Sequence, residues 1–180
     1  MISKGRTNVR ILDDPRQSVN SCTMPREPRT LLGTWQRLRA WPAGTWLFSK
    51  LLGRSVPYSG TIGAHVRDLG RGHARLTLRD RRAVRQHLSS IHAVALVNLG
   101  ELTSGLALVS ALPAGVRAIV LGLSADFYKK ARGTVSAETT ISPPVVTGPV
   151  EMPVTAELRD STNDLVCRVT VRWRLDQERP

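Results

Sequence analysis

The long apolar stretch between residues 91 and 112 constrains the fold more than any other feature of the sequence. A run of this length and composition forms either a membrane span or a helix that a globular domain buries. The stretch carries His92, Asn98 and Glu101, and a carboxylate near the centre of a lone span costs roughly 2.5 to 3.5 kcal/mol on insertion scales. We therefore expect a buried helix from about residue 91 to residue 108, and no membrane span.

Strand-like patterns flank this helix on both sides. Before it, residues 58–82 alternate apolar and polar side chains around a turn at Gly70 to Gly72, which predicts a hairpin with one solvent-facing side. After it, Pro, Gly and Asn-Asp turns separate four further runs. These runs span residues 117–128, 133–141, 152–159 and 165–175. There is no βαβ alternation, so the order predicts an α+β domain whose antiparallel sheet wraps around the long helix.

The length of the chain suits a single domain. With 180 residues, one compact core is expected. We place the domain at residues 29–176, beginning with short helices over residues 29–53 that break at Pro42. Residues 1–28 predict a flexible N-terminal extension without a secretory signal, and residues 177–180 a tail. Met24 precedes the first clear pattern and is an alternative start of translation.

The amino-acid composition restricts the classes of partner that the protein can bind, but it does not identify one. The two cysteines, Cys22 and Cys167, indicate neither a disulfide framework nor a thiolate metal site, which fits a cytoplasmic protein. The formal charge of +12 favours anionic partners, whether phosphates, nucleic acid or acidic membrane surfaces. Much of it lies in residues 67–85, where a solvated strand face is the simplest explanation. No nucleic-acid-binding motif or metal-ligand spacing is recognisable, so we expect no specific nucleic acid and no metal.

The start of the long helix is the first candidate site. Ser89 or Ser90 can cap it, which leaves the N–H groups of Ile91, His92 and Ala93 without intrahelical partners. Free N–H groups at the positive end of a helix can stabilise developing negative charge.

Glu101 is the second candidate, because it lies among leucines, where an ionised carboxylate is costly without partners. Asn98 and Ser104 share its helical face and are expected to hydrogen-bond it. Burial alone leaves two roles open, a structural carboxylate paired with an arginine of the sheet or a chemical group. Glu101 follows His92 by nine residues, or about 13.5 Å of helix. One chain cannot join the two, so a shared site requires a dimer with antiparallel helices.

The run from Gln86 to Leu96, with Glu101 nine residues after His92, resembles the signature of PaaI-like hot-dog thioesterases. In that family a polar residue precedes a His-Gly-Gly helix start, and an acid follows nine residues after the His. Further features are similar to the DUF4442 branch, and the likeness covers roughly residues 29–175. These features are Trp35, Trp46, Pro57, Tyr58 and residues 129–133.

The resemblance implies a hot-dog domain that hydrolyses an acyl-CoA or acyl-carrier thioester as a homodimer, which can pair further into a tetramer. It implies that Glu101 is the nucleophile or general base and that the N–H of Ala93 helps to bind the oxyanion. It also implies roles for Gln86 in orienting the thioester or water, for Ser104 in assisting the acid, and for His92 in fixing the helix start.

Binding residues are expected around this centre. Asn98 lies on the helical face of the acid, and Lys129, Lys130 and Arg132 are candidates for holding coenzyme A phosphates, with an ordinary solvated turn as the alternative. Coenzyme A is part of the substrate, and no separate cofactor is expected. The pair Ala93-Val94 replaces the Gly-Gly of the family and adds side chains where the carbonyl must approach. A non-catalytic acyl-CoA- or lipid-binding protein is therefore the alternative function.

Overall fold

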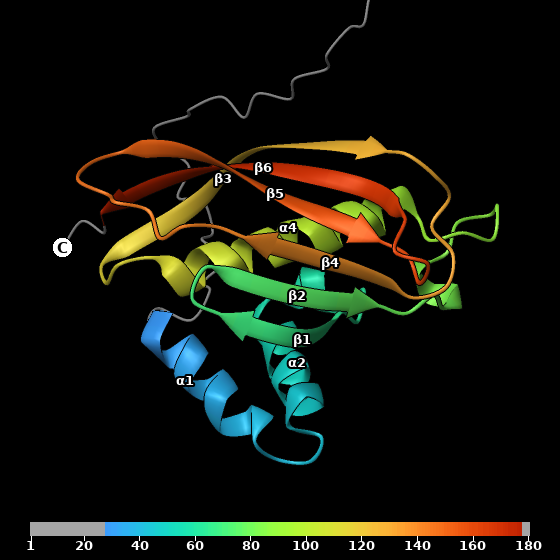
Figure 1. Cartoon of the computed structure of the whole chain (residues 1–180), viewed down its shortest axis with the longest axis horizontal. Coiled ribbons are helices and arrows are strands. Elements are labelled where there is room, and N and C mark those ends of the chain that lie inside the picture. Colours follow the sequence, from blue (N-terminus) through green and yellow to red (C-terminus); the bar gives the residue numbers. More distant parts are fainter. Residues whose placement is uncertain (1–27, 178–180) are drawn as a thin grey trace, which may run out of the picture.

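A computed structural model of the chain describes residues 28–177, so the expected extension and tail lie almost wholly outside the described residues. Six strands form one sheet in the order β1-β2-β4-β5-β6-β3, and every neighbouring pair is antiparallel. The sheet curves around one long helix, α4 (Ala93–Ala111) (Figure 1). The strands are β1 (His65–Gly70), β2 (His73–Leu78), β3 (Val116–Phe127), β4 (Val135–Thr140), β5 (Val150–Arg159) and β6 (Leu165–Gln177). This arrangement confirms the predicted α+β architecture.

Alternating side chains explain why the strands cover the helix. In β6, Val169, Val171 and Leu175 are buried, whereas Arg172 and Arg174 between them are exposed. Side chains of successive strand residues point to opposite faces, so one face of the sheet packs on α4 and the other meets solvent. The predicted strand runs after the helix match the observed strands to within about two residues at each end.

The predicted hairpin before the helix begins later than expected. Residues Pro57–Gly60 form a short helix, α3, and β1 starts only at His65. Proline fixes its own φ and lacks an N–H, which suits the first turn of a helix better than a strand. Gly60 then packs on Gly53, since a Cβ at Gly60 would lie 2.3 Å from the carbonyl oxygen of Gly53. This close approach packs α3 against the end of α2.

The helix α4 forms the centre of the core. Leu99, Leu106 and Leu108 are fully buried, and a Cβ added at Gly100 would lie 2.5 Å from Cβ of Val169 in β6. The helix is long and apolar enough to cross a membrane, yet 78% of its most apolar window is buried inside the domain. It is therefore the core helix that the sequence predicts.

Two further helices precede the sheet, α1 (Pro28–Arg39) and α2 (Gly44–Ser55). They separate at Pro42, as predicted, and Ala43 between them adopts a left-handed conformation with φ of 62°. The rings of Trp35 and Phe48 meet edge to face with centroids 5.1 Å apart, which holds the two helices together. Figure 1 shows this helical pair beside β1, with its connecting turn projecting from the body of the domain.

Candidate active site

Among the described residues, the first turn of α4 leaves one N–H group without a hydrogen-bond partner. His92 is the N-cap, with φ of −66° and ψ of 139°, and its Nδ1 accepts a hydrogen bond of 3.1 Å from the N–H of Val94. The N–H of Ile91 donates to the carbonyl of Ala131 at 2.9 Å, and that of His92 donates to the carbonyl of Val84 at 2.8 Å. Among these groups, only the N–H of Ala93 has no hydrogen-bond partner within residues 28–177.

The predicted cap is therefore wrong in position. Ser89 and Ser90 lie before the helix, and Ser90 instead accepts a hydrogen bond from Nε2 of Gln86 at 2.8 Å. The expectation of free N–H groups at Ile91 and His92 is also wrong, because the segment before α4 pairs with the chain around it: Arg85 and Ile91 form an isolated antiparallel bridge. The hydrogen bond from Gln86 to Ser90 thus helps to order the segment before α4.

Glu101 lies two turns further along α4. Its carboxylate is mostly buried, and it forms no hydrogen bond or ion pair with any residue in the described part of the chain. Burial raises the pKa of Glu101 above its ordinary value of 4.5, because an apolar surrounding disfavours the charged form. The structural alternative, a pair between Glu101 and an arginine of the sheet, is not found in the part of the chain that the structure describes.

The expected hydrogen bonds from Asn98 and Ser104 to the Glu101 carboxylate are absent within residues 28–177. Ser104 donates to the main-chain carbonyl of Glu101 at 2.8 Å, a bond that serine commonly makes inside a helix. Asn98 is 8% exposed, and its buried Oδ1 has no hydrogen-bond partner among the described residues. A buried polar atom without a partner costs free energy, so Asn98 lowers the stability of the fold at this position.

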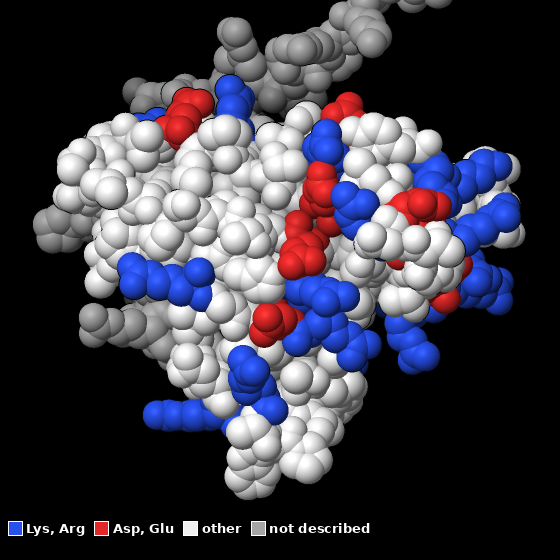
Figure 2. All heavy atoms as spheres, in the orientation of Figure 1, with Lys and Arg blue, Asp and Glu red and all other residues white. Residues whose placement is uncertain are grey.

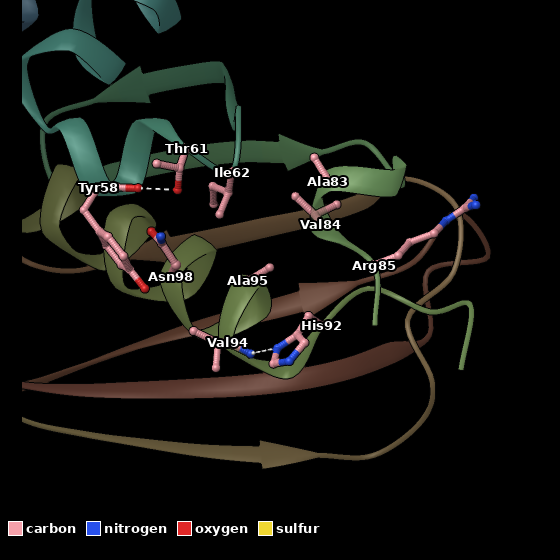
Figure 3. Close-up of a pocket in the computed structure, with 10 residues that line it drawn as sticks. All are labelled: Tyr58, Thr61, Ile62, Ala83, Val84, Arg85, His92, Val94, Ala95 and Asn98. Carbon is pink, nitrogen blue, oxygen red and sulfur yellow. Dashed lines mark hydrogen bonds between the residues drawn. The ribbon is translucent and has the colours of Figure 1, made fainter. Parts of the chain in front are cut away.

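Asn98 lines a cavity of about 240 Å³ beside the first turns of α4. Figure 3 shows Asn98, Val94 and His92 on the helix, with Tyr58 and Thr61 opposite them. The remaining lining residues are Ile62, Ala83, Val84, Arg85 and Ala95. Tyr58, Thr61, Val84 and Arg85 were not among the predicted site residues. Local sequence patterns gave no sign of this cavity, because the fold brings residues 58–62 against residues 83–98.

The connection between β3 and β4 closes against the same end of the helix. Asp80 holds it there, since its carboxylate accepts a hydrogen bond of 3.0 Å from the N–H of Gly133 and pairs with Arg85. These contacts lower the pKa of Asp80, with the Arg85 hydrogen bond as the largest cause. Ala131, which accepts the N–H of Ile91, belongs to this connection.

The three predicted phosphate-binding cations differ in their surroundings. Lys129 pairs with Asp160 at 2.8 Å and with Asp164 at 2.7 Å. Lys130 and Arg132 are exposed and make no ion pair with other described residues. Figure 2 shows lysine and arginine side chains gathered at this end of the molecule, on the right. Two of the three cations thus remain open to an external anion.

The predicted site residues on α4 are spread along the helix. His92 and Ala93 lie at its start, whereas Asn98, Glu101 and Ser104 lie further along it. Ala93 and Glu101 are eight residues apart, or about 12 Å along the axis. Within the described residues, no three His, Cys, Asp or Glu side chains come together as metal ligands would.

A known family matches most of the domain. The family model described as "Domain of unknown function (DUF4442)" matches residues 44–175. No curated protein matches the chain significantly.

Solved structures share the fold. A structural-genomics protein is 28% identical with a TM-score of 0.70, over 82% of this chain and 99% of that one. A Pseudomonas aeruginosa protein named a probable thioesterase is 20% identical with a TM-score of 0.67, over 77% and 97% of the two chains. A Haemophilus influenzae thioesterase is 20% identical with a TM-score of 0.58, over 67% and 82%. These likenesses confirm the predicted hot-dog arrangement of sheet and central helix.

Proposed function

Because the chain belongs to the DUF4442 family within the hot-dog superfamily, we propose that it is a thioesterase that hydrolyses acyl-CoA or acyl-carrier thioesters. The observation that carries the proposal is the carboxylate of Glu101, which is mostly buried on the core helix and has no partner within residues 28–177. The names of the structural neighbours support the same reaction class.

Glu101 serves the reaction as nucleophile or general base. As a base, its carboxylate takes a proton from water while the water oxygen attacks the thioester carbonyl carbon. The C–S bond then breaks, the acid product forms and the thiolate leaves with a proton. As a nucleophile, a carboxylate oxygen attacks the same carbon, the C–S bond breaks and the thiolate leaves, and water then hydrolyses the resulting anhydride to the acid product and free Glu101. Burial suits both routes, since a raised pKa makes the carboxylate a stronger base near neutral pH.

The N–H of Ala93 stabilises the oxyanion that forms on the carbonyl oxygen. It is the one free donor of the first turn of α4 among the described residues, and it lies at the positive end of the helix. Since about 12 Å of helix separates it from Glu101, the acid of one subunit works with Ala93 of the partner subunit. His92 caps the start of the helix by accepting a hydrogen bond from the N–H of Val94. Gln86 orders the segment before the helix through its bond to Ser90, and Ser104 donates to the main-chain carbonyl of Glu101.

A homodimer is consistent with the free edge of the sheet. Within residues 28–177, strand β3 pairs with β6 on one side and has no strand on the other. Leu123 and Phe127 are about half exposed, although they lie opposite the buried Val171 and Cys167 of β6 and so point to the helix side. An unpaired edge with apolar side chains favours pairing with a second chain. Two copies joined at β3 would bring their core helices together.

The substrate enters at the end of the molecule where the helix begins. The cavity beside Asn98 receives part of the acyl group, and Lys130 and Arg132 meet the phosphates of the carrier. Lys129, bound to two aspartates, positions the loop. No separate cofactor takes part, and the protein acts in the cytoplasm.

A free-thiol assay over short, medium, long and aromatic acyl-CoAs tests the proposal. We expect release of coenzyme A from at least one class and its loss in Glu101→Gln. Glu151→Gln is the matched control, because Glu151 is an exposed glutamate with only a distant contact of 3.8 Å to Arg172. Equal turnover in the parent and Glu101→Gln would contradict the assignment of Glu101.

The alternative function, a non-catalytic acyl-CoA- or lipid-binding protein, is favoured by one observation. Val94 is 55% exposed and lines the cavity, and its N–H is already bonded to His92, so the helix start offers one donor to an oxyanion rather than two. A binder would gain thermal stability from acyl-CoAs without releasing thiol from any of them.

A further inference from the structure

The turn between α1 and α2, together with the exposed side of α2, carries a concentration of large apolar side chains. Trp41 is 74% exposed and Trp46 is 54% exposed, while the other two tryptophans of the chain, Trp35 and Trp173, are buried. Leu47 and Leu51 of α2 are also exposed. We call Trp41, Trp46, Leu47 and Leu51 the tip. Large exposed apolar groups that gather in this way mark interaction sites.

The fold does not require these side chains. α2 packs on the domain through Gly44, Phe48 and Leu52, which are buried, and the tip residues lie outside that contact. Trp46 is contacted by the Nζ of Lys50, 5.7 Å from its ring centroid, which leaves the ring open to solvent on its other sides. Folding alone therefore gives no reason for tryptophan at this exposed position.

The charged residues nearest to the tip in the sequence are all basic. Residues 31–64 contain no Asp or Glu, and their charged residues are Arg37, Arg39, Lys50 and Arg54. Arg39 makes a distant contact of 3.9 Å with Asp68, and the other three form no ion pair within the described residues. Figure 2 shows the corresponding protrusion at the lower edge of the molecule, uncharged at its end, with lysine and arginine side chains directly above.

We propose that the tip docks on an anionic phospholipid surface. Tryptophan and leucine suit the boundary between headgroups and acyl chains, and lysine and arginine on the polar side meet acidic headgroups. A second copy fits poorly, because a tip facing a tip would bring the same basic residues together. The helices lie on the surface and do not cross it. The surface site is separate from the active site and does not depend on the proposed hydrolysis.

Vesicle binding by the full chain tests the proposal. The protein is sedimented with vesicles of phosphatidylcholine alone and of phosphatidylcholine with phosphatidylglycerol. We expect binding to the anionic vesicles only, weakening as salt is raised. Tryptophan emission should move to shorter wavelength on binding, because Trp41 and Trp46 enter a less polar environment while Trp35 and Trp173 are already buried. Equal binding to both vesicle types, or to neither, would overturn the proposal.

Two pairs of variants locate the surface. Trp41→Ser with Trp46→Ser should weaken binding about tenfold or more, whereas Val145→Ser, at an 87% exposed loop position, should leave it unchanged. Lys50→Glu with Arg54→Glu should weaken binding more than Arg75→Glu with Arg174→Glu, which changes the net charge equally on the outer face of the sheet. Circular dichroism confirms that each variant is folded.

Other partners would be revealed by the same variants. Unchanged vesicle binding in the serine double variant would show that the tip is not the membrane contact. Equal losses in the two charge variants would reduce the effect to net charge and also overturn the proposal. Self-association can be measured by light scattering. If it is abolished in the serine double variant and unaffected by vesicles, the tip binds a second copy of the chain instead. Tip-dependent binding of an acidic polypeptide with no vesicle binding would likewise replace the lipid surface.

Discussion

The two sides of α4 differ in how closely they pack and in the polar groups that they carry. Toward the sheet, Leu99, Gly100 and Ala107 are buried, and the fit is close enough that Gly100 leaves no room for a Cβ against Val169. On the side turned away from the sheet, Asn98 and Glu101 are polar groups without side-chain partners in the described part of the chain. The difference indicates that the side facing the sheet is fixed by close packing, whereas Asn98 and Glu101 on the other side lower the stability without a compensating side-chain contact among the described residues.

Replacing Glu101 by glutamine gives the largest expected effect. If the carboxylate is the nucleophile or base, kcat for acyl-CoA hydrolysis should fall by about 10²- to 10⁴-fold, because the amide can neither attack nor take a proton. The loss should appear in kcat rather than in KM, measured by free-thiol release. A loss confined to KM would indicate that Glu101 binds the substrate without reacting.

The same variant should be more stable than the parent at neutral pH. The pKa of Glu101 is raised in the folded state, so its contribution to stability is complete below the ordinary value of 4.5 and is lost as pH rises through the raised pKa. Glu101→Gln removes that loss. The Tm difference should therefore be small near pH 4 and grow in favour of glutamine toward pH 8, and a constant difference would argue against a raised pKa.

On the opposite side of the helix, Gly100→Ala should destabilise the fold by about 1–3 kcal/mol, because the new Cβ would lie 2.5 Å from Val169. Gly33→Ala in α1 is the matched control, since a Cβ there meets nothing within 4 Å and alanine is the better helix former by about 1 kcal/mol. Urea titration measures both. Equal free energies of unfolding in the two variants would contradict the difference between the side of α4 that packs on the sheet and the side that carries Asn98 and Glu101.

Asn98→Leu tests the side of α4 that carries Glu101, and its expected effect on the free energy of unfolding is smaller. It removes a buried oxygen that lacks a partner, and such an atom costs about 1–3 kcal/mol, so the free energy of unfolding should stay level or rise. The KM for the preferred thioester should rise in the same variant. A marked loss of stability would show that Asn98 supports the fold rather than the substrate.

The smallest effect is expected among the cations near the helix start. Lys130→Ala with Arg132→Ala should raise the KM for acyl-CoA a few-fold and leave kcat unchanged, since charge at the rim acts on binding. Lys129→Ala should change the KM less, because Lys129 already pairs with Asp160 and Asp164. A larger KM effect from Lys129 would reverse these assignments.

Features that depend only on residues close together in the chain could be predicted from the sequence. The alternation in β6 and the apolar length of α4 identified both elements, because strand and helix periods are local. The cap of α4 was misplaced because Val84 and Ala131, which bind the N–H groups of His92 and Ile91, are brought there by tertiary structure. The cavity beside Asn98 was missed for the same reason.

The central claim is that Glu101 of one subunit completes a site with the N–H of Ala93 of the partner subunit. Ala93→Pro removes that N–H while suiting the first helical position, and the extended conformation of His92 accepts a following proline. Heterodimers of Ala93→Pro and Glu101→Gln, isolated with two affinity tags, contain one intact site if the claim holds. They should recover about half of the parent's thiol release, whereas both homodimers stay inactive. Heterodimers as inactive as the homodimers would contradict the shared site.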